Sequence, residues 1–227
     1  MAEGTGTDSV VALVPMRHES ERLPGKNYRD FAGKPLFHHI IETLLACDVI
    51  DRVVIDTDSD LIWQQTEAHF PGVSLLERPA HLCPGTIPMN DVLLNATAQI
   101  GAHTYLQTHC TNPLLTAETI TRAVETHRQH YPVYDTLFGV TRRQTYFWDQ
   151  LVRPVNHNPA VLQRSQDLPP FYEENSNLYI FTRETLVRRH NRIGERPYLF
   201  EIDRYEAYDI NEEMDFVVAE FLYRRRR

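Results

Sequence analysis

Residues 10–27, VVALVPMRHESERLPGKN, decide the fold. They open with five consecutive apolar residues, 10–14. A run that is apolar at every position suits a strand covered on both faces, as in a parallel sheet. Pro15 has no N–H to donate, so we expect it to end the hydrogen-bonded ladder. The stretch therefore predicts a buried first strand of an α/β protein, followed by a loop.

The loop carries the residue types that bind phosphate. Arg17, Arg22 and Lys26 supply positive charge, Ser20 and Asn27 supply hydrogen-bonding side chains, and a Pro-Gly pair supplies a turn. Open α/β sheets bind ligands at the carboxyl ends of their strands, and guanidinium and ammonium groups suit polyanions. Because the loop fits neither the Walker A nor the GxGxxG pattern, the residues alone leave solvated loop charges as an equal alternative.

The pattern R-x-x-S at residues 17–20, followed by R-L-P-G-K-N at residues 22–27, resembles the opening signature of the acylneuraminate cytidylyltransferase family. That family usually has a basic residue directly after the serine, where this chain has Glu21. The resemblance implies catalytic roles for Arg17 and Lys26. It implies that nucleotide binding involves Arg17, Ser20, Arg22, Lys26 and Asn27.

Composition limits the class of protein. With 227 residues the chain is long enough for one sizeable α/β domain, and we expect a single domain over residues 1–227. The formal charge, 23 minus 31 or −8, argues against a nucleic-acid partner. Three irregularly spaced cysteines predict reduced thiols. We find neither a signal peptide nor an apolar run of membrane-spanning length, so we expect a cytoplasmic protein without a membrane partner.

Apolar strands and amphipathic helices alternate along the chain, which predicts an α/β fold with a single, doubly wound, mostly parallel sheet. The resembled family has such a Rossmann-like nucleotidyltransferase fold. Strands are predicted at residues 10–14, 52–55, 73–76, 104–107, 136–140 and 177–181, and helices at residues 35–45, 61–70, 90–100, 116–130, 183–190 and 211–223.

Residues 141–170 interrupt the alternation. They contain four prolines and no clear periodicity, which predicts an excursion from the sheet. In the resembled family the corresponding region projects from the domain and helps to form a homodimer, so the resemblance implies a homodimer here.

Residues 77–82, ERPAHL, resemble the family's R-P-x-x-L element, which borders the nucleotide base. The resemblance implies that Arg78 lies against cytosine and that Gly85 and Thr86 contact the base. The alternative is a simple turn in which Arg78 pairs with its neighbour Glu77.

Residues 106–115, LQTHCTNPLL, loosely resemble the family's L-L-Q-P-T-S-P-L-R strand end, with extra residues after the glutamine and Leu115 in place of a common arginine. The resemblance implies contacts of Gln107, Thr111 and Asn112 with the acceptor sugar or the cytidine. The alternative is that Thr-Asn-Pro is a turn before a helix.

Arg164 and Gln166, together with residues 172–180, resemble the family elements R-x-Q-x-x-P and E-N-G-x-I-Y-I, with Ser176 in place of the glycine. A guanidinium can bind a sugar carboxylate with two hydrogen bonds. The resemblance implies sugar binding by Arg164, Gln166, Tyr172 and Asn175, whereas packing of Tyr172 in a dimer interface is the competing interpretation.

Asp209 and Asn211 lie where the family has its D-I-D element. Alternate residues of an extended segment project to one side, so their side chains should share a face. Carboxylate and amide oxygens suit Mg²⁺, which also binds substrate phosphates. The resemblance implies that Asp209 is catalytic and that Asp209 and Asn211 hold Mg²⁺, the expected cofactor. The alternative is that Asn211 caps the following helix.

The resemblance implies transfer of CMP from CTP to the anomeric hydroxyl of a 2-keto-3-deoxy sugar acid, a sialic acid-like nonulosonate, with release of pyrophosphate. Glu21 and Leu115 leave open a phosphonate or a sugar phosphate as the acceptor. Asn211 leaves open a non-catalytic nucleotide-binding homologue.

Overall fold

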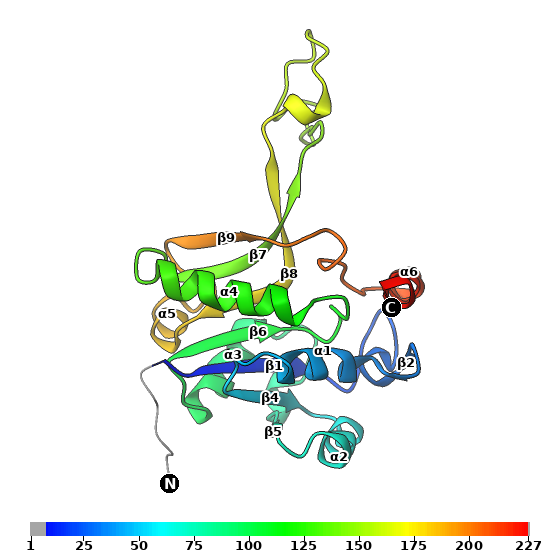
Figure 1. Cartoon of the computed structure of the whole chain (residues 1–227), viewed down its shortest axis with the longest axis vertical. Helices are drawn as coiled ribbons and strands as arrows, with labels where there is room; N and C mark the ends of the chain where they lie inside the picture. The colour runs from blue at the N-terminus through cyan, green and yellow to red at the C-terminus, as the bar shows by residue number, and fades with distance from the viewer. Residues whose placement is uncertain (1–7, 227) are drawn as a thin grey trace.

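The computed structural model describes residues 8–226, and its centre is a seven-stranded sheet in the order β5-β4-β1-β6-β8-β7-β9 (Figure 1). Strand β8 runs antiparallel to both of its neighbours, and the other paired strands are parallel. The predicted mostly parallel sheet is thus confirmed. The strands are β1 (Val10–Met16), β4 (Arg52–Thr57), β5 (Ser74–Glu77), β6 (Thr104–Thr108), β7 (Thr136–Arg143), β8 (Phe171–Phe181) and β9 (Pro197–Glu201).

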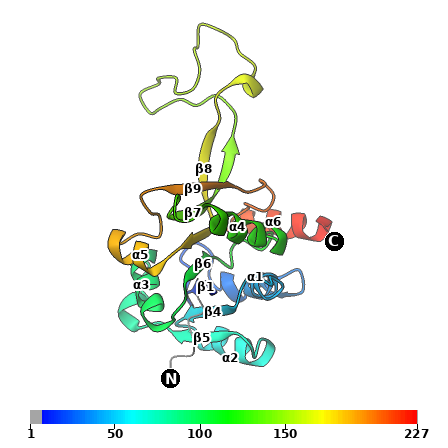
Figure 2. The ribbon, with the colours of Figure 1, turned by 60° about the vertical axis from the view of Figure 1, so that its left-hand side comes forward.

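Helices cover both faces of the sheet, as Figure 2 shows. Val10, Ala12 and Val14 pack in the cluster that includes α1 and α4, whereas Val11 and Leu13 pack in the cluster that includes α3 and α5. The first strand is therefore buried on both faces, as its unbroken apolar run predicts. The helices are α1 (Leu36–Leu45), α2 (Asp60–His69), α3 (Met89–Gln99), α4 (Ala117–His130) and α5 (Arg183–Arg189).

Strand β1 continues past the proline that we expected to end it. Pro15 and Met16 still pair with β4, whereas pairing with β6 ends at Leu13. Beyond Leu13 one side of β1 carries no ladder, and there the missing N–H of a proline costs little. This one-sided end leaves the carboxyl end of β1 open for the loop that follows.

The predicted helix starts are accurate where a side chain caps the helix. Ser59 accepts a hydrogen bond from the Ile62 N–H at the start of α2, and Thr116 accepts one from the Thr119 N–H at the start of α4. Hydroxyl side chains are preferred at this N-cap position, because they bond N–H groups that the helix itself leaves unpaired.

Three strands of the described residues lie outside the predicted set. The two-stranded hairpin of β2 (Asp30–Phe31) and β3 (Lys34–Pro35) packs against the last helix, α6 (Glu213–Arg226), through a small cluster that contains Phe31 and Phe216. Strand β9 adds a parallel edge beside β7. These contacts bring the chain just before α6 beside the loop that follows β1.

Strands β7 and β8 extend beyond the sheet as a hairpin arm, which carries residues 144–170 at its tip (Figure 1). The predicted excursion covered residues 141–170, but β7 runs to Arg143, so the irregular segment is shorter. The arm contains one turn of 3-10 helix, η3 (Ser165–Asp167). None of the helices within residues 8–226 has both the length and the apolar character that a membrane crossing requires.

Candidate active site

A cleft of about 360 Å³ opens at the carboxyl ends of β1 and β6. The loop after β1 is turned into it by Gly25, whose φ of 69° lies in the left-handed region that glycine adopts without strain. All five loop residues predicted to bind nucleotide line this cleft: Arg17, Ser20, Arg22, Lys26 and Asn27.

Lys26 and Asn27 are buried and fixed by hydrogen bonds. The Lys26 Nζ donates to the backbone oxygen of Ile210 at 2.7 Å, and burial lowers the pKa of its ammonium. The Asn27 Nδ2 donates to the backbone oxygen of Arg17 at 2.7 Å, and its Oδ1 accepts from the Cys110 Sγ at 3.1 Å. Lys26 thus supplies a positive charge at the cleft wall, whereas Asn27 connects the β1 loop to Cys110 through its hydrogen bonds.

The cations of the β1 loop face an acidic segment from the other end of the sequence. The Asn211 Nδ2 donates to the Asp209 Oδ2 at 2.8 Å, and the Asn211 Oδ1 accepts from the Arg22 Nη2 at 2.6 Å. The predicted juxtaposition of residues 209 and 211 is confirmed. The start of α6 is capped by Asp215, whose Oδ2 accepts from the N–H groups of Asn211 and Glu212, each at 2.9 Å.

The donor set around Asp209 suits Mg²⁺. Residues 8–226 contain no cluster of three or more His, Cys, Asp or Glu side chains placed around a metal. Mg²⁺, however, is often held by one or two carboxylates together with substrate phosphates. Among the described residues, only Asn211 bonds the Asp209 carboxylate, and it does so through Oδ2, so the other oxygen keeps its acceptor capacity for a ligand. Asp209 therefore fits the metal better than Asn211, whose amide oxygen is bound to Arg22.

Arg78 also lines the cleft and is paired with an aspartate of β4. Its Nε donates to the Asp56 Oδ1 at 2.5 Å and its Nη2 to the Asp56 backbone oxygen at 3.2 Å, and each side chain is only 2% exposed. Pairing with Glu77, the alternative from the sequence, does not occur among the described contacts. The fixed guanidinium keeps further N–H donors for a ligand.

The mouth of the cleft is formed by Arg17, Glu21 and Gly85. The Arg17 Nη1 lies 3.9 Å from the Glu21 Oε1, and a Cβ on Gly85 would lie 2.0 Å from that same oxygen and 2.8 Å from the Arg17 Nη1. A larger residue here would displace the ends of these two flexible side chains. Thr86, also predicted to contact the base, is exposed beside the cleft and is not among its lining residues.

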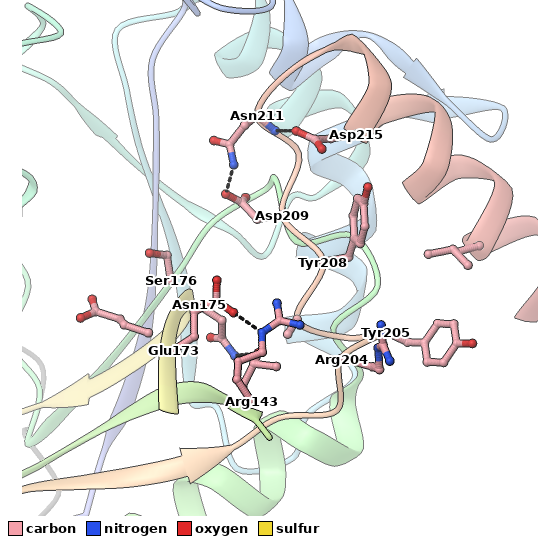
Figure 3. Close-up of a pocket in the computed structure, with 14 residues that line it drawn as sticks. Arg143, Glu173, Asn175, Ser176, Arg204, Tyr205, Tyr208, Asp209, Asn211 and Asp215 are labelled. Carbon is pink, nitrogen blue, oxygen red and sulfur yellow. Dashed lines mark hydrogen bonds and ion pairs between the residues drawn. The ribbon is translucent and has the colours of Figure 1, made fainter. Parts of the chain in front are cut away.

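A second cavity of about 780 Å³ adjoins the first (Figure 3). Figure 3 shows Asp209 and Asn211 at one end and Arg143 with Glu173 at the other. Asn175, predicted to bind sugar, lies on its wall. The two cavities have three lining residues in common: Ser176, Asp209 and Asn211.

Ser176 has a φ of 54°, in the left-handed region. The family pattern has glycine at this position, and glycine adopts this conformation without cost, whereas a serine there is strained. Ser176 therefore lies in a backbone conformation that glycine, the residue of the family pattern, would adopt without strain.

Two of the residues predicted to bind sugar on the β6 loop are placed elsewhere. Gln107 and Asn112 are fully buried and do not line either cavity. The Gln107 Oε1 accepts from the Arg192 Nη1 at 2.5 Å, so its amide is used inside the protein. Thr111 does line the first cleft. The loose match at the β6 end therefore located the loop correctly but not all of its contacts.

The three predicted sugar-binding residues of the arm do not reach the cavities of their own chain. Arg164 is paired with Asp167 near the tip, at 2.7 Å, and Gln166 lies beside it in η3. Tyr172 is exposed at the base of the arm. Within one chain, the structure brings none of these side chains to the site.

Sequence reasoning missed two residues beside the site, His109 and Arg192. His109 lines the first cleft, and Arg192 lies with its guanidinium 3.5 Å from the ring centroid of Tyr179. His109 was visible as part of the extra residues after Gln107. No local signal marks Arg192, because its contacts depend on the loop between α5 and β9.

Comparison with known proteins bears on the family to which this chain belongs. Residues 11–223 match the family model described as cytidylyltransferase. The chain is 27% identical to post-translational flagellin modification protein B of Campylobacter coli over 96% of both chains. It is 24% identical to pseudaminic acid cytidylyltransferase of Campylobacter jejuni, over 94% of this chain and 96% of that protein.

Two further matches agree. N-acylneuraminate cytidylyltransferase A of Danio rerio is 27% identical over 93% of this chain, which spans only 50% of that protein. A solved structure of CMP:2-keto-3-deoxy-manno-octonic acid synthetase complexed with CTP superposes with a TM-score of 0.72 at 14% identity, over 96% of this chain and 100% of that chain. The chain belongs to the cytidylyltransferase family.

Proposed function

We propose that this CTP-dependent nucleotidyltransferase transfers CMP to the anomeric hydroxyl of a 2-keto-3-deoxy sugar acid of the nonulosonate class, with release of pyrophosphate. The observation that carries the proposal is the pair of cavities that meet at Ser176, Asp209 and Asn211. A cationic cleft for a nucleoside triphosphate and a larger polar cavity for a sugar share one acidic boundary, where the attacking and leaving groups have to meet.

The first cleft supplies what a phosphoryl transfer needs. In-line attack by a sugar oxygen on the α-phosphorus needs positioning and charge stabilisation, and no protein nucleophile. Arg17, Arg22 and Lys26 provide positive charge for the triphosphate oxygens and the departing pyrophosphate. Arg78, held by Asp56, is placed to donate hydrogen bonds to acceptor atoms of cytosine.

Asp209, with Asn211 beside it, is the proposed holder of Mg²⁺. When bound, the ion would add positive charge next to the phosphate oxygens and help to orient the triphosphate. Asp209 sets the position of that charge, and Arg22 holds Asn211 through a 2.6 Å hydrogen bond.

The second cavity is the proposed acceptor site. Its lining includes two arginines, Arg143 and Arg204, together with Asn175 and Tyr208. Arg143 is paired with Glu173 at 2.6 Å, whereas no ion pair of Arg204 is found among residues 8–226. Arg204 is therefore the better candidate in the same chain for a sugar carboxylate. The relatives that act on pseudaminic acid and N-acylneuraminate support an acceptor of this class.

We also propose that the arm forms a homodimer. Its tip exposes large apolar side chains that a monomer would leave in water: Leu162 is 97% exposed and Leu151 63%. Contiguous exposed apolar surface marks association sites. In such a dimer Arg164, Gln166 and Tyr172 could meet the acceptor site of the partner. Analytical ultracentrifugation of the wild type and of a Leu151→Asp, Leu162→Asp double variant tests this. The wild type is expected to sediment as a dimer and the double variant as a monomer.

The test of the function is pyrophosphate release. The wild-type chain is incubated with Mg²⁺, with CTP, ATP, GTP or UTP, and with N-acetylneuraminate, legionaminate, pseudaminate, Kdo, an aminoalkylphosphonate or a sugar phosphate. Release with CTP and one nonulosonate is expected. Release only with the phosphonate or the sugar phosphate would disprove the proposed acceptor, and CTP binding without release for any acceptor would disprove the proposed reaction.

A further inference from the structure

His109 is a polar side chain of the nucleotide cleft to which the proposed reaction gives no role. It follows β6 directly, within the residues by which this chain differs from the family pattern, and it lines the cleft together with Lys26 and Thr111. Its Nε2 lies 2.9 Å from the Gln107 Nε2.

A chain of three side chains sets which nitrogen of His109 carries the proton. Arg192 can only donate, so the Gln107 Oε1 that it contacts at 2.5 Å must be the acceptor. The other end of the amide is then the NH₂ group, which also donates to the Thr108 backbone oxygen at 3.2 Å. Because that NH₂ faces the His109 Nε2, this nitrogen must accept. The ring proton therefore lies on Nδ1.

The same contacts prevent His109 from taking up a second proton. A charged imidazole would carry an N–H at Nε2 as well, and this donor would face the donor NH₂ group of Gln107. The charged groups that face the ring from neighbouring elements are Arg192, from the loop between α5 and β9, and Lys26, from η1 (Lys26–Tyr28). Burial and these two cations lower the pKa of His109 to about 3. The ring is neutral throughout the working range of an enzyme, and it cannot accept a proton from the sugar hydroxyl at Nδ1.

The Nδ1–H group is on the part of the ring that is left for the cleft, because Nε2 faces Gln107 and His109 lines the cleft. No residue in the described part of the chain bonds the Nδ1 atom of His109. This nitrogen is not among the fully buried side-chain atoms that lack a partner, although most of the ring is buried. The register of β6 and β8, in which Thr108 pairs with Leu178, carries the chain after β6 past Ser176. Ser176 lines both cavities, and His109 lines the first cleft together with it.

We propose that His109 is locked as the neutral Nδ1–H tautomer and donates a hydrogen bond from Nδ1 to an oxygen of the acceptor. Arg192 and Gln107 are positioning residues that set the polarity of this donor. The part that concerns the acceptor rests on the proposed function, whereas the locked tautomer does not. In this proposal the His109 side chain contacts the sugar, and the Gln107 side chain contacts His109 instead of the sugar.

Nitrogen-15 NMR of the histidine-labelled protein tests the lock directly, because the two neutral tautomers and the charged ring differ in their nitrogen shifts. The His109 signals are assigned by their loss in a His109→Gln variant. The Nδ1–H pattern is expected without change from pH 5 to 8. An Nε2–H pattern or a titration within that range would overturn the proposal.

Gln107→Glu supplies the second test. A carboxylate still accepts from Arg192 but cannot donate to the His109 Nε2, so the ring is expected to leave the Nδ1–H state, by tautomer exchange or by protonation. Gln99→Glu, the same change on an exposed residue of α3, is the matched control and should leave His109 unchanged. An unchanged His109 spectrum in Gln107→Glu would refute the relay of polarity.

Kinetics test the contact with the acceptor. In His109→Ala the KM of the best acceptor from the panel is expected to rise about tenfold, the loss of one neutral hydrogen bond, and to rise more than the KM for CTP. An unchanged acceptor KM would refute the contact. Should the wild type release no pyrophosphate with any acceptor, the proposed function fails, and the NMR result still decides on the locked tautomer.

Discussion

Replacing Asn211 by Asp tests the proposed metal site most directly, because it restores the residue of the family pattern. The Asn211 Nδ2 donates to the Asp209 Oδ2 at 2.8 Å. The change removes this hydrogen bond, which contributes about 1 kcal/mol. It also sets two carboxylates side by side, and two charges about 4 Å apart repel by about 1–4 kcal/mol at effective dielectric constants between 80 and 20. Arg22, which already bonds residue 211 at 2.6 Å, offsets part of the repulsion.

Without Mg²⁺ we therefore expect the free energy of unfolding to fall by about 2 kcal/mol. With Mg²⁺ and CTP the second carboxylate becomes a charged ligand, and the half-saturating Mg²⁺ concentration should fall about tenfold, equivalent to about 1.4 kcal/mol. Thermal unfolding with and without Mg²⁺, and turnover against Mg²⁺ concentration, measure both effects. Asn158→Asp adds the same charge on the exposed arm and serves as the control. Equal Mg²⁺ dependence in the wild type and in Asn211→Asp would refute a metal at Asp209.

Three further changes have expected outcomes. Lys26→Ala should lower kcat/KM for CTP about 100-fold, as loss of a preorganised charge does, and full turnover would exclude Lys26 from the phosphate site. Asp56→Asn leaves the buried Arg78 charge without its partner, so urea unfolding should show a loss of about 3 kcal/mol and the KM for CTP should rise. Burial lowers the pKa of His127 to about 4, so between pH 6.5 and 4 the unfolded chain binds a proton that the folded chain does not. The free energy of unfolding should then fall as the pH falls through that window, by about 3 kcal/mol in all. Urea unfolding at pH 7 and at pH 5 should show a smaller loss of stability for His127→Gln than for the wild type.

The sheet and its helices could be predicted because their signals are local. The unbroken apolar run that opens β1, and the hydroxyl caps Ser59 and Thr116, each act within a few residues of the element they define. Strand β9 was missed because Pro197 starts it and only Phe200 within it is buried, which leaves little alternation to read. Its pairing with β7 comes from the tertiary fold.

The site was predictable where neighbouring residues share one task. The loop after β1 brings its cations to the cleft as one unit. Arg192 could not be found in this way, because its partners, Gln107 and Tyr179, come from two separate strands. The placement of Gln107 behind His109 has the same origin: it depends on which side chain fills the space between β6 and the α5–β9 loop.

Two of the departures from the family pattern, Glu21 and Asn211, both affect the charge of the cleft. Glu21 lies 3.9 Å from Arg17 at the mouth of the cleft and weakens its positive charge. Asn211 has no charge, so Arg22 gains only a neutral acceptor there and keeps its own charge for the triphosphate. A second carboxylate at 211 would instead neutralise Arg22 unless a metal took it up. With Glu21 present, the neutral Asn211 thus preserves the cationic character of the cleft. We therefore expect the turnover of this chain to depend more strongly on Lys26, and less strongly on tight binding of Mg²⁺, than the turnover of its Asn211→Asp variant.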